Sequence, residues 1–275
     1  MKIKSFVKRF FKKYHGFNFV CGLVICGIIF LAAFIAVFHT PYGSTEMNAS
    51  LKFASPSFAH IFGCDNYGRD IFSRVLEGIR NTFFIALTTV FIGTFAGIVI
   101  GAGCGYYGGR LDHVLMRVND ALFAFPSVLL ALVIISLLGP SSFNVTIALG
   151  IAFIPSFARI VRSEYKKQAA LDYVQSAKLM GAGDMRIIFV HILPNILPVL
   201  MSSVMIGFNN AVLAEAGLSY LGIGVQPPNA SLGRMLSEAQ SYIFTAPWYA
   251  LFPGLMIIIM VLGFSLLSEG ISENS

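Results

Sequence analysis

Long stretches of this sequence contain no charged side chain, and this feature limits the fold more than any other. Residues 81–109 and residues 121–158 hold no Asp, Glu, Lys or Arg. A helix of about 20 apolar residues crosses the roughly 30 Å hydrocarbon core of a bilayer, so each stretch is long enough to do so. The whole chain is 56% hydrophobic and only 12% charged, whereas soluble domains are about a quarter charged. We therefore expect much of the apolar surface to face lipid, which excludes an ordinary soluble domain and a disordered chain.

The apolar pattern predicts an all-α polytopic membrane protein with six transmembrane helices. Gly139 and Pro140 interrupt the second uncharged stretch and divide it into two helices joined by a tight turn. The fourth predicted helix is the shortest and contains Pro155. The predicted spans are residues 19–38, 83–103, 121–138, 143–158, 196–216 and 248–267. Around them we place a basic N-terminal segment (1–18), an extracytoplasmic segment (39–81), a five-helix region (82–268) that includes a cytoplasmic loop (159–195), and a C-terminal tail (269–275).

The distribution of basic residues predicts that both termini are cytoplasmic. Lys and Arg are retained on the cytoplasmic side of membrane proteins. With the N-terminus inside, only five of the 19 basic residues lie outside, namely Lys52, Arg69, Arg74, Arg80 and Arg234. Without the fourth span, the basic residues of the 159–186 loop would also lie outside, so the charges support that span. The first apolar run lacks a small-x-small cleavage site, so we interpret it as a retained anchor.

Several kinds of chemistry have no counterpart in the sequence. No GxxxxGK[ST] phosphate loop occurs, so any ATP energy must come from a partner. The five His are scattered without metal-ligand spacing, which disfavours a metal site. Ser202 and Ser203 lie in the fifth predicted span with no His at that depth, which disfavours an intramembrane hydrolase and favours hydrogen bonding between helices.

Ionisable side chains within membrane spans usually mark functional positions. Glu215, near the outer end of the fifth span, is the only acid inside an apolar stretch. It either lines a translocation path or reaches the membrane interface. An ion-coupled carrier would be expected to bury more such groups, so their scarcity argues against one. The second span carries glycines at four-residue spacing, which predicts a smooth face for close helix packing; they are Gly93, Gly97, Gly101, Gly105 and Gly109.

The largest cytoplasmic loop has the pattern of two short helices separated by a turn. Ala170, Val174 and Ala177 recur at helical spacing and form one apolar face. Residues 181–184 then break the helix, and Asp184 can cap a second short helix over residues 185–190. The whole unit is expected to end at Pro194, where the fifth span begins. Such a unit either rests on lipid as an interfacial helix or is presented to a soluble partner.

Residues 172–195, DYVQSAKLMGAGDMRIIFVHILPN, resemble the cytoplasmic loop signature of the membrane subunits of ABC importers. That signature is Glu-Ala-Ala, three residues, Gly, nine residues, and Ile-x-Leu-Pro. Here Ala177, Gly181 and the pair Leu193 and Pro194 match. Gln175 and Ser176 replace the Glu and the first Ala, and His191 replaces the Ile.

Two further segments narrow the resemblance to the dipeptide, oligopeptide and nickel branch of these importers. Residues 62–74, FGCDNYGRDIFSR, resemble its FGTDxxGRDxxSR segment, with Cys64 in place of Thr. Residues 219–228, SYLGIGVQPP, resemble its SFLGLGVQPP segment. Together the likeness covers roughly residues 62–268 and is closest to the second, or C-type, permease of such systems.

The resemblance implies a type I ABC importer transmembrane domain in a prokaryotic cell membrane. A homologous permease would complete the pathway, two cytoplasmic ATPase subunits would hold ATP and Mg²⁺, and an extracytoplasmic binding protein would deliver substrate. The chain itself would bind no cofactor or nucleic acid and would not be an enzyme. Peptides are the first expected substrate, and nickel or a metal chelate is the alternative.

The same resemblance implies roles for particular residues. The expected ATPase-coupling residues are Asp172, Gln175, Ser176, Ala177, Leu179, Met180, Gly181, Ala182, Gly183, Asp184, Leu193 and Pro194. The first outer motif contributes Gly63, Asp65, Gly68, Arg69 and Asp70, which either brace a turn or touch a substrate-delivering partner. The second contributes Gly222, Gly224, Gln226, Pro227 and Pro228, which we expect to be scaffold first and docking surface second.

Overall fold

The computed structural model describes residues 16–272. In it, every long apolar stretch of the sequence forms helix. Five helices are long and apolar enough to cross a membrane. They are α2 (Phe17–Phe38), α3 (Ile71–Tyr107), α6 (Ser142–Ala169), α9 (Leu193–Tyr220, continuous with the helical turns from Asp184) and α11 (Pro247–Ser272). The shorter elements are η1 (Ala49–Leu51), α4 (Gly109–Phe123), α5 (Ser127–Leu138), α7 (Asp172–Leu179), α8 (Asp184–Arg186), η2 (Ile187–Ile192), α10 (Leu232–Ala239) and η3 (Gln240–Tyr242). Within the described residues, the β-type pairing is limited to one isolated bridge between Cys64 and Asp70.

The predicted third span, residues 121–138, is divided in the structure between α4 and α5, so the prediction of one helix there is wrong. α4 and α5 meet at an angle of 86°. Pro126 lies at the break, and a proline disfavours helical backbone in the residue before it. α5 has only 12 residues, which is too short to cross a bilayer alone. The amphipathic α4 buries Asp112, Met116 and Asn119 on its inner side.

Three of the other helices extend further than hydropathy predicts. α3 begins at Ile71 because the Asp70 carboxylate accepts a hydrogen bond from the Ser73 backbone N–H (2.8 Å) and caps the helix. α6 continues past Arg159 to Ala169, so the predicted loop 159–195 begins as helix. α11 continues beyond residue 268 to Ser272.

Pro194 does not separate the loop from the fifth span, contrary to the prediction, because the helical turns that begin at Asp184 continue through it. The π-helical η2 immediately precedes it and leads into α9, and such local π turns accommodate proline in membrane helices. Asp184 does not cap the second helix either, since Gly183 holds the N-cap position and no side chain caps it. The Asp184 carboxylate instead accepts a hydrogen bond from the Tyr106 hydroxyl (2.7 Å).

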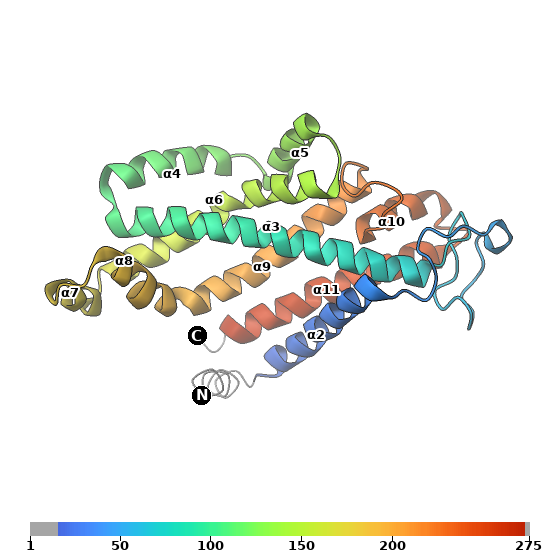
Figure 1. Ribbon diagram of the computed structural model, residues 1–275, viewed down its shortest axis with the longest axis horizontal. Helices are drawn as coiled ribbons and strands as arrows, with labels where there is room; N and C mark the ends of the chain where they lie inside the picture. The colour runs from blue at the N-terminus through green and yellow to red at the C-terminus, as the bar shows by residue number, and fades with distance from the viewer. Residues whose placement is uncertain (1–15, 273–275) are drawn as a thin grey trace.

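α3 and α6 pack along their lengths, as Figure 1 shows, and the glycine face of α3 makes this possible. A Cβ atom on Gly97, Gly101 or Gly105 would lie 2.5–2.6 Å from atoms of α6. The predicted packing face is therefore confirmed for these positions. Gly109 is not part of it, because it begins α4 with a positive φ of 58° and nothing lies within 4 Å of its Cβ position.

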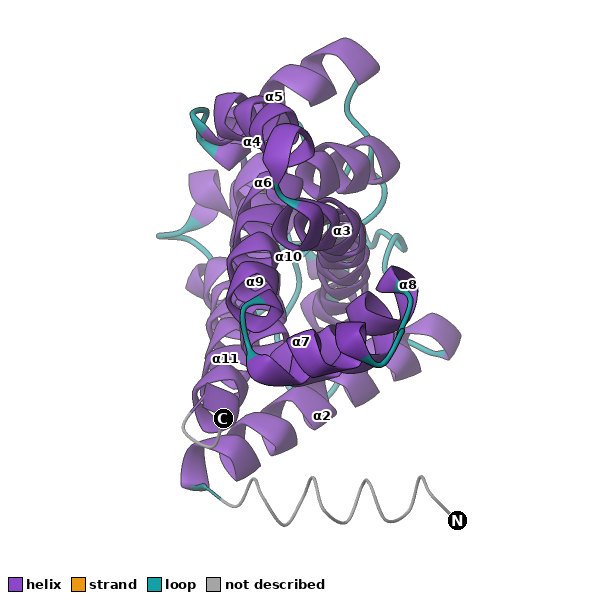
Figure 2. Cartoon of the chain, turned by 90° about the vertical axis from the view of Figure 1, so that its left-hand side faces the viewer, coloured by secondary structure: helices purple, strands orange, loops and turns teal. Residues whose placement is uncertain are grey.

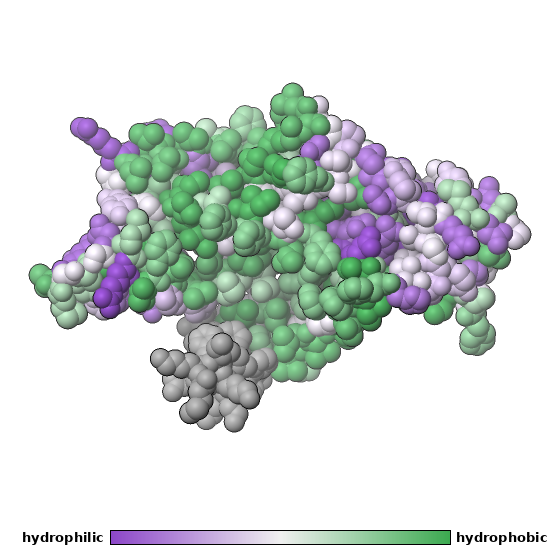
Figure 3. Space-filling view, in the orientation of Figure 1, coloured by the Kyte–Doolittle hydropathy of each residue, from purple (hydrophilic) through white to green (hydrophobic). Residues whose placement is uncertain are grey.

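The two ends of the bundle carry different elements. α7, the start of α2 and the end of α11 lie at one end, which we call the α7 end, and Figure 2 shows α7 lying across it. Residues 39–70 and α10 lie at the other, which we call the α10 end. Between them, apolar side chains cover most of the face shown in Figure 3. Exposed apolar residues of α3 include Phe91 and Phe95. This arrangement is that of a bundle with a lipid-facing middle and two polar ends.

Candidate functional site

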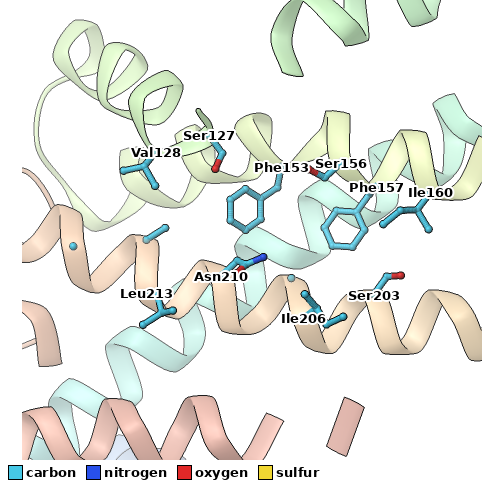
Figure 4. Close-up of a pocket in the computed structure, with 13 residues that line it drawn as sticks. Ser127, Val128, Phe153, Ser156, Phe157, Ile160, Ser203, Ile206, Asn210 and Leu213 are labelled. Atoms are coloured by element: carbon cyan, nitrogen blue, oxygen red, sulfur yellow. The ribbon is translucent and has the colours of Figure 1, made fainter. Parts of the chain in front are cut away.

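A cavity of about 620 Å³ lies between α5, α6 and α9. Its α9 side is one face of the helix, with lining residues spaced three or four apart from Ser203 to Gly217. α6 contributes Phe153 and Phe157, which Figure 4 shows pointing from α6 toward α9. The start of α5 closes one side with Ser127. The cavity was not predicted, because it depends on which helix faces meet.

The described residues that line the cavity carry no charge. Its polar groups are three serine hydroxyls and one carboxamide, on Ser127, Ser156, Ser203 and Asn210. The Asn210 side chain is exposed and lies beside the two aromatic rings in Figure 4. Ser203, which we expected to join helices, lies on this face and donates a hydrogen bond to the Val199 carbonyl (2.8 Å). Such a surface can hydrogen-bond an uncharged polar group without holding an ion.

Glu215 lies on the side of α9 turned away from the cavity. It is fully buried, so the interpretation that it reaches the membrane interface is wrong, and it is not among the cavity-lining residues. The Thr82 hydroxyl donates to one carboxylate oxygen (2.8 Å) and the Ser219 hydroxyl to the other (2.6 Å). Ser219 Oγ also accepts a hydrogen bond from the Val225 N–H (3.0 Å). Glu215 thus joins α9 to α3 and to the loop that follows α9.

That loop contains the second outer motif, and it folds onto itself. A Cβ atom on Gly224 would lie 2.1 Å from Ser219 Oγ, so only glycine fits there. The Gln226 side chain donates hydrogen bonds to the carbonyls of Gly222 and Gly224 (3.0 Å each). The bond between Pro227 and Pro228 is cis. These contacts are internal to the loop, as expected of a scaffold.

The first outer motif forms a buried turn stabilised by charge. Asp65 is fully buried and accepts hydrogen bonds from the backbone N–H of Arg69 (2.9 Å) and from its Nε (2.6 Å). Asp70 pairs with His60 Nδ1 (2.9 Å) in addition to capping α3. A Cβ atom on Gly68 would lie 1.8 Å from the Asn48 carbonyl oxygen. Of the two interpretations of these residues, the contacts support bracing.

Residues outside the predicted set complete this ion-pair cluster. Glu238 of α10 accepts hydrogen bonds from Arg69 Nη2 and Arg74 Nη2 (both 2.9 Å). The Tyr249 hydroxyl of α11 donates to the same Glu238 oxygen (2.8 Å). We call Asp65, Arg69, Arg74, Glu238 and Tyr249 the outer cluster. It joins the start of α3 to α10 and α11, and the only signal in the sequence was the presence of charges in a charge-poor chain.

The charges of the outer cluster shift the protonation equilibria of its members. Burial alone would raise the pKa of the Glu238 carboxyl, but the neighbouring Arg74 charge and the Tyr249 hydrogen bond outweigh it. The pKa of Glu238 therefore lies below its ordinary value of 4.5. Burial would lower the pKa of Arg69, but Asp65 and Glu238 raise it above the ordinary value. Glu238 and Arg69 are therefore charged near neutral pH.

At the α7 end, a glycine turn ends α7. Gly181 has a positive φ of 80°, which favours glycine, and nothing lies within 4 Å of its Cβ position. Its N–H donates to the Lys178 carbonyl (2.9 Å), and the Ala182 N–H donates to the Ala177 carbonyl (3.0 Å). These two bonds form a Schellman motif, which terminates a helix and satisfies its last carbonyl groups.

α7 buries one face and exposes another. Val174 and Ala177 are buried in a cluster with Ile187, Ile188 and Tyr165. The expected coupling residues Leu179 and Met180 are 89% and 81% exposed, and Met185 beyond the turn is 65% exposed. Gln175 donates a hydrogen bond to the Ala169 carbonyl at the end of α6 (2.9 Å), so it joins α7 to that helix.

Contacts that the sequence did not predict attach the α7 loop to helices α3 and α6. Besides bonding Asp184, the Tyr106 ring of α3 lies 5.0 Å from Lys178 Nζ. The Tyr165 hydroxyl of α6 donates to the Ile188 carbonyl in η2 (3.2 Å). α6 ends next to α7, and the helical turns beginning at Asp184 continue into α9. The loop therefore connects the two helices that form opposite walls of the cavity.

Residues 72–274 match the family described as binding-protein-dependent transport system inner membrane component. The chain belongs to this family. It is 37% identical over 270 residues to the dipeptide transport system permease protein DppC of Haemophilus influenzae, covering 96% of this chain and 91% of that protein. It is also 37% identical over 271 residues to the glutathione transport system permease protein GsiD of Pectobacterium atrosepticum, covering 98% and 89%.

A solved structure shares the fold. A chain of the MetNI methionine ABC transporter, in an inward-facing conformation, matches with a TM-score of 0.60. The match covers 74% of this chain and 96% of that chain at 17% identity. The predicted type I importer transmembrane fold is thereby confirmed.

Proposed function

We propose that this chain is a permease subunit of an ATP-driven ABC importer and forms one side of a pathway for di- and oligopeptides. The observation that carries the proposal is the connection between the exposed α7 loop and the cavity. α6 and α9 form facing walls of the cavity, and the same two helices lead into the loop. A partner that moves the loop would therefore move both walls.

The substrate class is inferred from the relatives and from the cavity lining. Permeases named for dipeptide and glutathione transport are 37% identical to this chain over nearly all of its length. Serine hydroxyls and the Asn210 carboxamide can donate to and accept from peptide groups. A lining without charge binds such groups weakly, which suits passage, while selection would reside in the extracytoplasmic binding protein.

The partners follow from the two ends of the bundle. A homologous permease would close the open side of the cavity. Two ATPase subunits, which hold ATP and Mg²⁺, would bind the corresponding loops of the two permeases, and one of them would bind the α7 loop of this chain through the exposed side chains of Leu179, Met180 and Met185. The substrate-binding protein would dock at the α10 end.

This assignment places the α7 end, and with it both termini, in the cytoplasm. In the described part of the chain, Lys166, Lys167, Lys178 and Arg186 lie in or next to the α7 loop. At the α10 end, by contrast, the basic Arg69, Arg74 and Arg234 are paired with acids. Lys167 pairs with Glu164 (2.6 Å), but within the described residues Lys166, Lys178 and Arg186 form no ion pair with an acid, and this excess of positive charge at the α7 end is what a cytoplasmic side has. The basic segment of residues 1–15 lies outside the described residues.

Uptake by a strain that lacks only this gene tests the proposed function. Initial rates are compared for a labelled dipeptide, a labelled pentapeptide and radioactive nickel, with and without the restored gene. We expect gene-dependent uptake of peptide. If only nickel uptake depends on the gene, the substrate is nickel and not peptide. If uptake of all three is unchanged in a strain without a redundant system, the proposal is contradicted.

A further inference from the structure

The ring of Phe157 lies in a notch made by glycines of two other helices. A Cβ atom on Gly97 of α3 would lie 2.5 Å from Phe157 Cβ, and one on Gly93 would lie 3.2 Å from its Cδ2. A Cβ atom on Gly207 of α9 would lie 2.6 Å from Cζ, the tip of the ring. Phe157 is only 3% exposed, yet it lines the cavity. Protein thus surrounds the ring on the α3 and α9 sides, and the cavity lies on the other.

This geometry determines where the ring goes if the notch is filled. Carbon atoms in contact lie about 3.5–4.0 Å apart, so a methyl group on residue 207 would displace the ring tip by roughly 1 Å. On the α3 side the ring lies close to the helix, since a Cβ atom on Gly93 would already lie within 3.2 Å of Cδ2, whereas the cavity is open. We therefore expect the displaced ring to move toward the cavity, which Phe153 and Ile160 of the same wall also line.

We propose that Gly207 is a specificity-determining residue, because by receiving the Phe157 ring it sets the cross-section of the pathway and hence the largest substrate that passes. The inference rests on the proposed function, in which the cavity is part of the pathway. In this proposal Gly207 acts only through the position of the Phe157 ring and does not itself contact the substrate. It predicts that a side chain in the notch lowers the uptake of long peptides more than the uptake of short ones.

The same helix offers a matched control. Gly217 lines the same cavity on the same face of α9, but nothing lies within 4 Å of its Cβ position. Gly217→Ala therefore adds the same methyl group without moving a ring. Gly207→Ala combined with Phe157→Leu is the second control, since the shorter side chain leaves the notch free for the methyl group.

The experiment measures initial uptake of a dipeptide and a pentapeptide by the complete transporter carrying each variant, normalised to the amount of protein in the membrane. Small changes in the fit of a pocket change discrimination by roughly 10- to 200-fold. We expect Gly207→Ala to lower the ratio of pentapeptide to dipeptide uptake by about tenfold or more. Gly217→Ala should leave the ratio within about twofold, and the double variant should restore it. An unchanged ratio in Gly207→Ala, or an equal change in Gly217→Ala, would overturn the proposal.

A second measurement tests the width of the cavity by chemical labelling, without any peptide. Ser203→Cys places a thiol in the cavity wall, and its labelling rates with a small and a bulky thiol reagent are compared in the presence and absence of Gly207→Ala. We expect the alanine to slow the bulky reagent selectively, and equal slowing of both reagents would overturn the proposal. Selective slowing in a protein that imports no peptide would uphold the role of Gly207 while contradicting the proposed substrate.

Discussion

The two ends of the molecule are stabilised by different means. At the α10 end, charged side chains are buried and paired: Arg74 is fully buried, and Glu238 accepts hydrogen bonds from three arginines and a tyrosine. At the α7 end, apolar side chains such as Leu179 and Met180 are exposed, and the loop is attached to the bundle by a buried apolar cluster and by neutral or single side-chain hydrogen bonds of Tyr106, Tyr165 and Gln175. The α10 end is therefore closed by its own contacts, whereas the α7 end leaves an apolar surface that a partner could cover.

The largest expected effect comes from breaking the outer cluster. Glu238→Ala removes the acceptor shared by Arg69 and Arg74 and leaves their charges buried without it. Removing one partner of a buried ion pair typically costs about 3–5 kcal/mol. We expect a large fall in the unfolding temperature of the purified protein, measured by thermal denaturation.

An exposed ion pair between α4 and α6, away from the α10 end, provides the matched control for this variant. Asp120 accepts a hydrogen bond from Arg159 (2.8 Å), and both side chains are about half exposed. Exposed pairs contribute about 0–1 kcal/mol, so Asp120→Ala should barely change the unfolding temperature. Equal effects of the two variants would contradict the stabilisation of the α10 end by its buried pairs.

The next largest effect is on coupling rather than on stability. Gly181→Arg places a long charged side chain at the turn beside the exposed face of α7, where the Cβ position is free of contacts. We expect transport to be lost while the partner ATPase still hydrolyses ATP, measured as the ratio of uptake to phosphate release. Gly181→Asn is the control, because Asn tolerates positive φ and is short. Normal transport by the Arg variant would contradict the loop assignment.

A moderate effect is expected on acidification of the α10 end. The pKa of Glu238 is lower in the folded protein than its ordinary value of 4.5. The stability from this shift is therefore present above about pH 4.5 and lost as the pH falls through the lowered value. The unfolding temperature should fall in this acidic range, and Glu238→Gln should show a smaller fall. An identical acid dependence in both proteins would exclude Glu238 as its source.

The smallest effect is expected for Glu215→Gln. Two hydroxyl groups donate to the carboxylate, and a carboxamide retains one acceptor oxygen while the hydroxyl groups can rotate to accept from its NH₂ group. We expect uptake to remain mostly intact and stability to fall by about 1 kcal/mol. Complete loss of uptake from a normally folded variant would instead place Glu215 in the pathway.

Hydropathy and motif spacing predicted the membrane-spanning fold, the glycine face of α3 and the turn at Gly181. They did not predict where helices end outside the membrane, because capping by Asp70 and ion pairs such as Arg162 with Asp112 extend them beyond the apolar residues. The break at Pro126 was also not predicted, because the mean hydropathy of a stretch of residues does not depend on whether the helix bends within it.

The parts of the site that were missed depend on long-range contacts. Glu238 lies 164 residues from Arg74 along the chain, and no local pattern joins them. The cavity arises because one face of α9 meets one face of α6. Ser203 and Asn210, seven residues apart on that α9 face, were the available signal, but small polar residues in a membrane helix also occur between packed helices.

Distance measurements with paired spin labels on the assembled transporter test the contrast between the ends most directly. One pair, at Met180 and Phe17, reports on the α7 end, and the other, at Lys52 and Phe244, reports on the α10 end; all four residues are exposed. We predict that ATP binding by the partner subunits changes the distance in the first pair and leaves the second unchanged. A change confined to the second pair, or equal changes in both, would contradict the assignment of the α7 end as the moving, partner-bound end.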